Sequence, residues 1–242
     1  MEHSISDIVS WHWFKGNEVT GRLLQDVCLF RSAVLFDSGL RENFGGHGRN
    51  FGDTHYADFD SYHVVASQNN IILGTIRITP PEIANVTSSV LGFEDYKAFV
   101  ASLNYDLKNT IEMNRLMVKA DTRKLNLGKM LLYAAVGVIE NIWDRERFLI
   151  ICSAGNCASQ ASYLKRHSDF ETVENMPDRF SELFNDSVSF LKYRQPPYLK
   201  GATEIKIFSE LFAKQVSLPW SRLEMSFKST QKNYSDVLDA EL

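Results

Sequence analysis

The segment that most constrains the fold runs from residue 126 to 143, where apolar side chains occupy most positions until Glu140. A surface helix carries one apolar stripe, whereas a helix that is apolar on most sides is packed inside the protein. A mixed run at 111–118 precedes this segment, and RFLIIC at 147–152 follows it. A continuous apolar run of that kind is typical of a central strand. The pattern therefore predicts a helix that packs on a sheet.

The rest of the chain predicts further elements of the same sheet. Strands are expected at 62–66, 71–78, 111–118, 170–173 and 188–193, and helices at 22–37, 158–167 and 205–214. Residues 82–109 are expected to be partly helical. Alternation of strands and helices around one mixed sheet predicts the α/β (α+β) class. We expect one domain over 22–227, an N-terminal extension over 1–21 with exposed aromatic side chains, and a flexible tail over 228–242.

Composition excludes several classes of protein. The chain has 242 residues, 44% of them hydrophobic, and a net charge of −4, so it can bury a core and lacks the basic balance of nucleic-acid binders. Its three cysteines and six histidines have no spacing typical of disulfides or metal sites, so we expect reduced thiols and no metal. With no secretory signal and no apolar run long enough for a membrane span, we expect a cytoplasmic protein.

The loop that opens the long helix has features of a phosphate site. It contains Arg123, Lys124, Asn126 and Gly128. The first N–H groups of a helix have no partner inside the helix and lie at the positive end of its dipole. Such a helix start binds phosphate groups, and a glycine lets the backbone come close to a ligand. The same strand-loop-helix pattern also occurs as a plain tight connection.

The run RKLNLGKML at 123–131 resembles the R/Q-x-x-G-x-G/A signature of the GNAT superfamily of N-acetyltransferases. The resemblance implies the acyl-CoA N-acyltransferase fold: a mixed, mostly antiparallel, twisted sheet, splayed between its fourth and fifth strands and flanked by helices. It also implies that this loop holds the pyrophosphate of coenzyme A. Asn126 replaces the first glycine of the signature, and asparagine tolerates the left-handed backbone better than most residues. The implied binding residues are Arg123, Lys124, Asn126, Leu127, Gly128 and Lys129.

A second segment resembles the same superfamily. Asn156 is followed seven residues later by Tyr163, as in the element N-x-x-A-x-x-x-Y, although Ser159 replaces its alanine. The resemblance implies that Asn156 binds the pantetheine arm and that Tyr163 protonates the departing thiolate, a step that a phenol can perform. Tyr163 is equally well explained as a half-buried aromatic side chain on an amphipathic helix.

A series of polar motifs resembles acyl-homoserine-lactone synthases and the related N-acyl amino acid synthases. These motifs are ADFD at 57–60, GTIR at 74–77 and EMNRL at 112–116, and the resemblance covers roughly residues 22–195. Arginine and carboxylate side chains form bidentate pairs, either to hold a substrate or only to order a loop. The expected substrate-binding residues are Arg31, Arg41, Asp58, Asp60, Arg77, Asn114 and Arg115.

The strand at 111–118 carries the expected chemistry. Alternation along a strand predicts Glu112 and Asn114 on one face and Arg115 on the other. Glu112 is the expected general base for an amine nucleophile, directly or through water. The resemblance implies that a main-chain N–H at Leu116, Met117 or Val118 stabilises the acyl oxyanion. It also implies a gap between the fourth and fifth strands that admits the pantetheine arm, with an apolar lining expected from Leu116, Met117, Ile150 and Cys152.

Together these motifs predict an N-acyltransferase that moves a medium or long acyl group from acyl carrier protein or acyl-CoA to the amine of an amino acid or similar molecule. The donor thioester is a substrate, and no permanently bound cofactor is expected. Three alternatives stay open: an acetyl-CoA-dependent N-acetyltransferase, an acyl-homoserine-lactone synthase that uses S-adenosylmethionine, and a non-catalytic thioester sensor. The sequence indicates neither the acceptor nor the oligomeric state.

Overall fold

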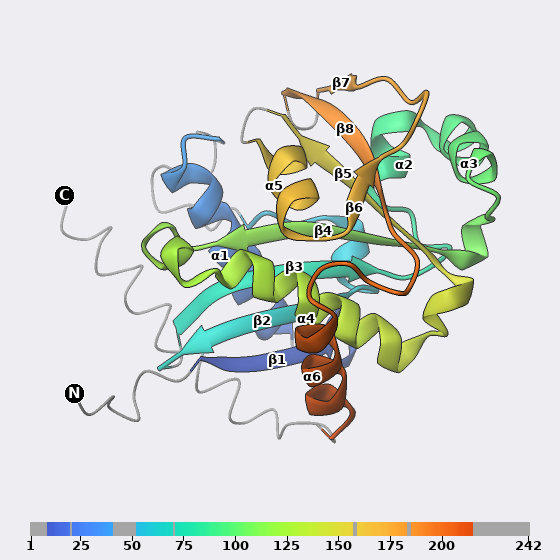
Figure 1. Ribbon diagram of the computed structural model, residues 1–242. Helices are drawn as coiled ribbons and strands as arrows, with labels where there is room; N and C mark the ends of the chain where they lie inside the picture. The colour runs from blue at the N-terminus through green and yellow to red at the C-terminus, as the bar shows by residue number, and fades with distance from the viewer. Residues whose placement is uncertain are drawn as a thin grey trace.

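The computed structural model describes residues 9–19, 21–40, 52–69, 71–156, 159–182 and 185–214. In this part of the chain an eight-stranded twisted sheet has the order β1-β2-β3-β4-β5-β8-β6, and β7 also pairs with β8 (Figure 1). Every strand pair is antiparallel except the parallel pair β4–β5. The strands are β1 Ser10–Lys15, β2 Tyr62–Gln68, β3 Ile71–Thr79, β4 Thr110–Val118, β5 Leu149–Gly155, β6 Phe170–Thr172, β7 Arg179–Ser181 and β8 Asp186–Tyr193.

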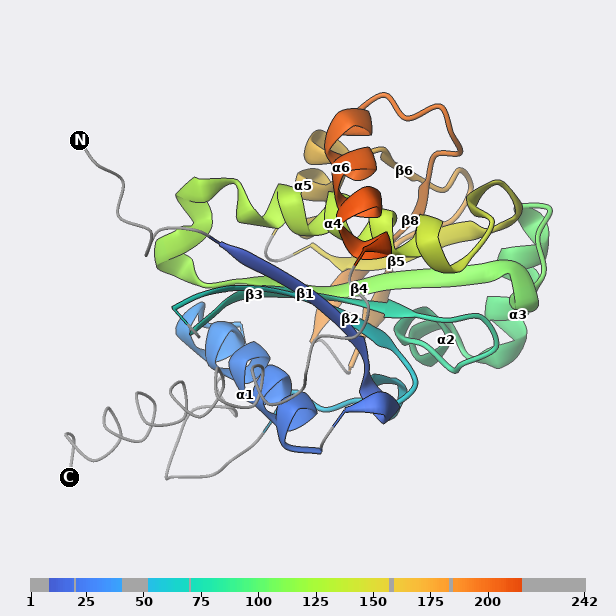
Figure 2. The same cartoon turned by 90° about the horizontal axis from the view of Figure 1, so that it is seen from below.

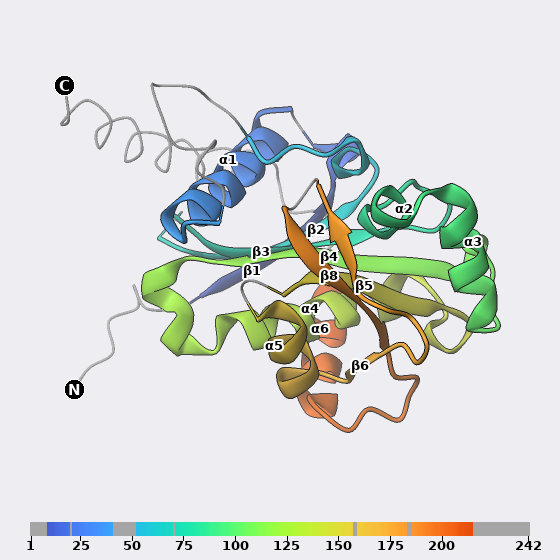
Figure 3. The ribbon, with the colours of Figure 1, turned by 90° about the horizontal axis from the view of Figure 1, so that it is seen from above.

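Helices cover both faces of the sheet. Figures 2 and 3 show α1, α2 and α3 on one face and α4, α5 and α6 on the other. The α-helices are α1 Gly21–Asp37, α2 Val86–Leu91, α3 Phe93–Ser102, α4 Leu127–Ile142, α5 Gln160–His167 and α6 Ala202–Ala213. Short 3-10 turns are η2 Gly16–Glu18, η4 Tyr56–Asp58, η5 Leu107–Asn109, η6 Ala120–Leu125 and η7 Arg145–Arg147. The predicted fold, a mixed and mostly antiparallel sheet between helices, is confirmed.

The main core lies between the sheet and α4. Leu131, Ala134, Val136 and Ile139 of this helix are fully buried against strands β2 to β5 and α6. Burial all round the helix confirms the interpretation of its sequence. No helix within the described ranges combines the length and the apolar character that crossing a membrane requires.

The N-terminal boundary of the domain differs from the prediction. Residues 10–15, expected in an exposed extension, form β1 and pair antiparallel with β2 along the edge of the sheet. Phe14 is buried beneath α1, and Trp11 and Trp13 are partly buried against the main core, where Trp11 meets Phe208 of α6 edge to face. The alternation of these aromatic side chains is a strand pattern, which the prediction missed. The tail over 228–242 lies outside the described residues.

The sheet opens between β4 and β5, as predicted. Only Thr110–Glu112 of β4 pair with Leu149–Ile151 of β5, although β4 continues to Val118 and β5 to Gly155. Past this point β5 pairs with β8 on its other side. The backbone of β4 from Met113 onward therefore has no partner strand on the β5 side. This opening sets the position of the candidate active site.

Candidate active site

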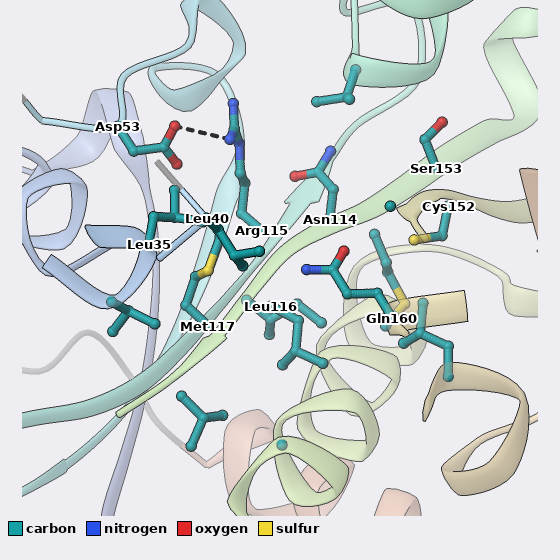
Figure 4. Close-up of a pocket in the computed structure, with 18 of the residues that line it drawn as sticks. Leu35, Leu40, Asp53, Asn114, Arg115, Leu116, Met117, Cys152, Ser153 and Gln160 are labelled. Carbon is teal, nitrogen blue, oxygen red and sulfur yellow. Dashed lines mark ion pairs between the residues drawn. The ribbon is translucent and has the colours of Figure 1, made fainter. Parts of the chain in front are cut away.

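A cavity of about 840 Å³ passes through the opening between β4 and β5. It is lined from the α1 side by residues such as Leu35, Asp53 and His55, and from the α4 side by residues such as Leu132 and Leu164. Figure 4 shows Asn114, Arg115, Leu116 and Met117 along β4, with Cys152 and Ser153 of β5 across the opening. The cavity thus joins the two faces of the sheet.

A β-bulge in β4 shapes the middle of this cavity. Thr75 is opposite Met117 and Arg77 is opposite Asn114, so two residues of β4 face the single residue Ile76 of β3. Arg115 has a φ of 55°, in the left-handed region that non-glycine residues rarely adopt. A bulge bends its strand, leaves the extra residue outside the ladder and re-aims a side chain.

The bulge makes the predicted orientation of Arg115 wrong. Strict alternation would place Arg115 on the face opposite Asn114. Instead its Nη1 forms an ion pair of 2.9 Å with Asp53 (Figure 4), which also pairs with Arg31 on the α1 side. Beyond the bulge, Leu116 packs with the main core and Met117 packs beneath α1. Asn114 and Arg115 therefore both lie on the α1 side of the sheet.

Five of the expected substrate-binding residues belong to one buried network. Both terminal nitrogens of the Arg31 guanidinium bind Asp58, with Nη1–Oδ1 at 2.9 Å and Nη2–Oδ2 at 2.7 Å. Arg77 donates from Nη1 to Asp58 at 2.7 Å and from Nε to the amide oxygen of Asn114 at 2.7 Å. Arg31 and Arg77 are fully buried. Through Asp53, Arg115 is the fifth of these residues to join the network.

The arginines determine the charge of Asp58. Burial alone would raise the pKa of this carboxyl group, but Arg31 and then Arg77 hold it well below its usual range. The pairing in turn raises the pKa of Arg31 despite the opposing effect of burial. Asp58 and Arg31 are thus both charged at neutral pH.

Of the two remaining predicted substrate-binding residues, the structure describes only Asp60, which is not in this network. Asp60 lies two residues beyond Asp58 in a turn and accepts a bond of 3.2 Å from the exposed Asn17. The 3-10 turn η4 directs Asp58 inward and separates it from Asp60. Arg41 lies outside the described residues.

Glu112 is completely enclosed. Its carboxylate accepts hydrogen bonds from the backbone N–H groups of Val86, at 2.9 Å, and Thr87, at 2.7 Å. The Thr87 hydroxyl and the Asn114 amide also donate to it. The described residues that line the cavity include Asn114 but not Glu112. A substrate amine in the cavity therefore has no direct contact with the predicted base.

The start of α4 lies at the cavity wall. Asn126 precedes the helix with a φ of 57°, so asparagine adopts the left-handed conformation expected of it. Gly128 lines the cavity, and a Cβ atom there would lie 2.6 Å from the hydroxyl oxygen of Tyr163. The glycine thus allows the close approach that its sequence position predicts. Leu127 is buried in the main core, and Lys129 follows Gly128 in the first turn. The side chains of Arg123 and Lys124 lie outside the description.

Tyr163 and Asn156 have different surroundings. Tyr163 lines the cavity, and its hydroxyl lies at the Lys129 N–H; burial raises the pKa of this phenol, and the bond with Lys129 opposes the rise. Asn156 instead donates to Asp178 at 2.8 Å and accepts from Ser189 at 3.1 Å. The Asn156 side chain is thus held by β8 and the segment before β7.

The apolar wall of the cavity lies mainly on the α4 side. Of the four residues expected to line it, Leu116, Met117 and Cys152 do so, whereas Ile150 is buried in the core and is not among the lining residues described. Further apolar lining that the sequence analysis missed comes from Met113, Leu132, Leu164, Phe170 and Val188. These residue types are the same as those of the ordinary core, so only their place beside the opening between β4 and β5 distinguishes them from core residues.

Three polar residues of the site were also missed. His55 and Ser153 line the cavity, and Thr87 joins Ser153 to Glu112. Burial and the charge of Arg77 lower the pKa of His55 to about 4, so its ring is neutral at pH 7. Its Nδ1 faces the Ala57 N–H, which places the ring proton on Nε2. No sequence motif indicates these residues, because the place of each in the site depends on contacts between segments that are far apart in the sequence.

The two cysteines within the described residues are not placed for thiol chemistry. Cys28 and Cys152 are buried free thiols, and burial raises the pKa of Cys28 to about 11. A thiol with a raised pKa is a poor nucleophile at neutral pH. Among the described residues, no group of three or more histidine, cysteine, aspartate or glutamate side chains is placed to hold a metal ion.

Comparison by structure identifies the fold. An acyl-CoA N-acyltransferase from Pseudomonas aeruginosa matches with a TM-score of 0.52 and 15% identity, over 77% of this chain and 100% of that one. The CoA-dependent acyl-homoserine lactone synthase BjaI matches with a TM-score of 0.56 and 12% identity, over 90% and 100%. A third match, the CoA-dependent acyl-homoserine lactone synthase MesI, has a TM-score of 0.54 and 12% identity, over 83% and 95%.

Comparison by sequence adds nothing to this: a scan against protein-family models and a search among curated proteins each return no match. The structural matches, at these identities, establish that the chain has the acyl-CoA N-acyltransferase fold.

Proposed function

We propose that this protein is an N-acyltransferase that moves an acyl group from acyl-CoA to the amine of an amino acid or similar small molecule. The observation that carries the proposal is the cavity through the β4–β5 opening. One side has the start of α4 and an apolar wall, and the other has the polar groups Asn114, Arg115 and His55. A thioester donor and a polar acceptor can therefore meet from opposite faces of the sheet.

The donor enters with its pyrophosphate at the start of α4, where backbone N–H groups favour an anion. The pantetheine arm then lies along the edge of β4 that β5 does not cover, where backbone groups can bind an extended chain. The acyl group packs against the apolar wall formed by Met113, Leu132 and Leu164. The volume and apolar lining favour a medium or long acyl chain. BjaI, a structural match, binds S-adenosylmethionine and isopentyl-CoA, which supports a CoA thioester as donor.

Transfer proceeds by direct attack of the amine nitrogen on the thioester carbon. The carbonyl oxygen takes up negative charge, which a backbone N–H near the bulge stabilises because it is fixed before reaction. The intermediate then collapses, the carbon–sulfur bond breaks, and the thiolate leaves. Tyr163 lies on the cavity wall with its pKa raised, so its phenol stays protonated at neutral pH and is the group that we assign to protonate the thiolate.

Turnover with a substrate panel tests the proposal. We expect the full chain to release free coenzyme A thiol from octanoyl-CoA or longer thioesters faster than from acetyl-CoA, and only when an amine is present. The panel of acceptors contains the twenty amino acids and S-adenosylmethionine, with mass spectrometry of the amide products. The same acyl chains on acyl carrier protein test that donor. If the protein neither binds nor transfers the acyl group of any thioester in the panel, the proposal is refuted.

Gly128→Val tests the place of the donor. The added side chain meets the Tyr163 hydroxyl and fills the space above the helix start. We expect acyl-CoA to bind at least about tenfold more weakly, with the thermal midpoint changed little. Ala101→Val, on an exposed position of α3, is the control and should bind normally. Unchanged acyl-CoA affinity in folded Gly128→Val would contradict the assigned position.

A second candidate activity is synthesis of an acyl-homoserine lactone, in which the acylated S-adenosylmethionine closes its own ring. The match with BjaI over 90% of this chain favours it. The buried arginine–aspartate network on the acceptor side agrees with a charged acceptor. Release of methylthioadenosine distinguishes lactone formation from simple amide formation.

A further inference from the structure

The surroundings of Glu112 limit how this carboxylate can take up a proton. Within the described part of the chain, four donors reach its two oxygens: the N–H groups of Val86 and Thr87, the Thr87 hydroxyl and the Asn114 amide. A carboxylate offers about four acceptor positions, so these donors occupy all of them. A substrate proton reaches Glu112 only by replacing one that a donor already shares with it.

Of these four donors, only the Thr87 hydroxyl can give up its proton and accept another. Backbone and side-chain amides bind their protons far too strongly to transfer them at neutral pH. A hydroxyl, in contrast, has one proton and two lone pairs. Its oxygen can accept a new proton as the old one moves to the carboxylate.

Thr87 has a second hydroxyl partner. Its Oγ1 lies 2.6 Å from the Oγ of Ser153, on β5. Because the single Thr87 proton points to Glu112, Ser153 must be the donor in this bond. Ser153 is partly buried and lines the cavity, and Figure 4 shows it across the opening from Asn114. Both lone pairs of the Ser153 oxygen therefore remain available to a group in the cavity.

We propose that Ser153 and Thr87 form a proton relay from the acceptor amine to Glu112. This inference rests on the proposed function. As the amine nitrogen bonds to the thioester carbon, its proton moves to Ser153 Oγ, the Ser153 proton moves to Thr87 Oγ1, and the Thr87 proton moves to Glu112. Each hydroxyl ends with one proton, the carboxylate becomes a carboxylic acid, and both hydrogen bonds reverse direction. After the amide leaves, the proton returns by the same path to solvent.

The relay assigns distinct roles to its residues. Ser153 touches the acceptor and is a catalytic residue. Thr87 acts through Ser153: it positions the Ser153 hydroxyl and passes the proton on to Glu112. Glu112 is the final proton acceptor without touching the substrate. The acceptor must bring its nitrogen to Ser153 on the α2 side of β5.

Thr87→Val tests the relay, because valine keeps the shape of threonine and replaces its hydroxyl with a methyl group. We expect kcat with saturating octanoyl-CoA and the best acceptor to fall about 100-fold or more at pH 7, in the range for loss of a general base. KM for octanoyl-CoA should stay within about threefold. Thr87→Ser restores the hydroxyl and should recover most of the rate. Ser153→Ala should resemble Thr87→Val.

The pH profile separates proton transfer from a structural role. Without the relay, the proton on the attacking nitrogen must leave to water or hydroxide. The hydroxide concentration rises about tenfold per pH unit, whereas both proteins depend equally on the free-amine fraction of the acceptor. The deficit of Thr87→Val should therefore shrink from pH 7 to pH 9, whereas a structural defect would be similar at both. Thr110→Val is the control: it removes a buried hydroxyl that bonds to Asp106 O, and its kcat should be unchanged.

Two results would overturn the relay, and they differ. If the wild-type protein transfers no acyl group to any amine, the proposed function fails and the relay fails with it. If the wild type is active and folded Thr87→Val keeps kcat within threefold, or loses the same factor at pH 7 and pH 9, the relay alone is wrong. Circular dichroism and octanoyl-CoA affinity establish that the variant is folded.

Discussion

The two faces of the sheet, which Figure 3 shows covered by different helices, differ in the side chains that they bury: one interior is mainly apolar, and the other combines apolar clusters with charged groups. Between the sheet and α4 the interior is apolar, with residues such as Ile111, Leu131 and Ile150 fully buried. On the α1 and α2 side the interior includes Arg31, Arg77 and Glu112, which are equally buried. The degree of burial therefore does not distinguish the residues of the core from those of the candidate active site. An apolar layer is stable without partners, whereas a buried charge needs one.

The largest expected effect is on the charged face. Asp58→Asn leaves Arg31 and Arg77 without the carboxylate that both bind. Removing one partner of a buried ion pair costs about 3–5 kcal/mol, so we expect a loss of this size in the free energy of unfolding, measured with urea. Asp60→Asn, two residues away and bonded to exposed Asn17, should cost less than about 0.5 kcal/mol. Equal losses would contradict the central position of Asp58.

The next effect divides the apolar face into core and cavity wall. Leu131→Ala removes a fully buried side chain that does not line the cavity described, and should cost about 3 kcal/mol. Leu132→Ala should cost roughly half as much, because part of this side chain already faces the cavity and makes fewer contacts. Only Leu132→Ala should shift the preferred acyl-CoA toward longer chains. A shift in both variants would mean that the wall is not where we place it.

The smallest effect concerns the pH dependence of stability on the charged face. His63 is fully buried and donates from Nε2 to Asp58 O; burial, and then the charge of Arg31, lower its pKa to about 4. The unfolded chain binds this proton below pH 6.5 and the folded chain does not. The free energy of unfolding therefore decreases as the pH is lowered, and His63 accounts for about 2 kcal/mol of this decrease between pH 7 and pH 5. His55, with a similarly lowered pKa, acts in the same direction.

Thermal or urea unfolding of His63→Gln at both pH values measures this contribution. The loss from pH 7 to pH 5 should be about 2 kcal/mol smaller in the variant than in the wild type. Asp26, whose pKa burial raises to about 6, acts in the opposite direction, but its effect is common to both proteins. An identical pH dependence in the two proteins would exclude His63 as the source.

Much of the apolar face could be predicted from sequence, because local patterns specify it. The apolar residues of α4 and the run RFLIIC reflect burial directly, and the left-handed turn at Asn126 follows from its residue type. The edge strand β1 was missed because alternating aromatic side chains near the terminus resembled an exposed segment. Its partner β2 is about fifty residues away, so no local pattern indicates the pairing.

The charged face was predicted in its residues but not in its connections. Arg31, Asp58, Arg77 and Asn114 were expected to bind substrate, and the structure joins them directly to one another. Which aspartate of ADFD turns inward depends on the 3-10 turn η4, which two-residue spacing does not reveal. Ser153 could not have been predicted either, because its contact with Thr87 requires β5 to lie beside α2.

The bulge at Arg115 also has a consequence for insertions and deletions. Loss of one residue between Met113 and Met117 would restore strict alternation along β4. Met117 and Val118 would keep their layers, but Asn114 and Arg115 could no longer both lie on the α1 side. If Leu116 is the residue lost, the arginine enters the apolar interior against α4. Over these few positions the length of the chain is therefore constrained as tightly as its residue types, and related chains should vary there by substitution rather than by gaps.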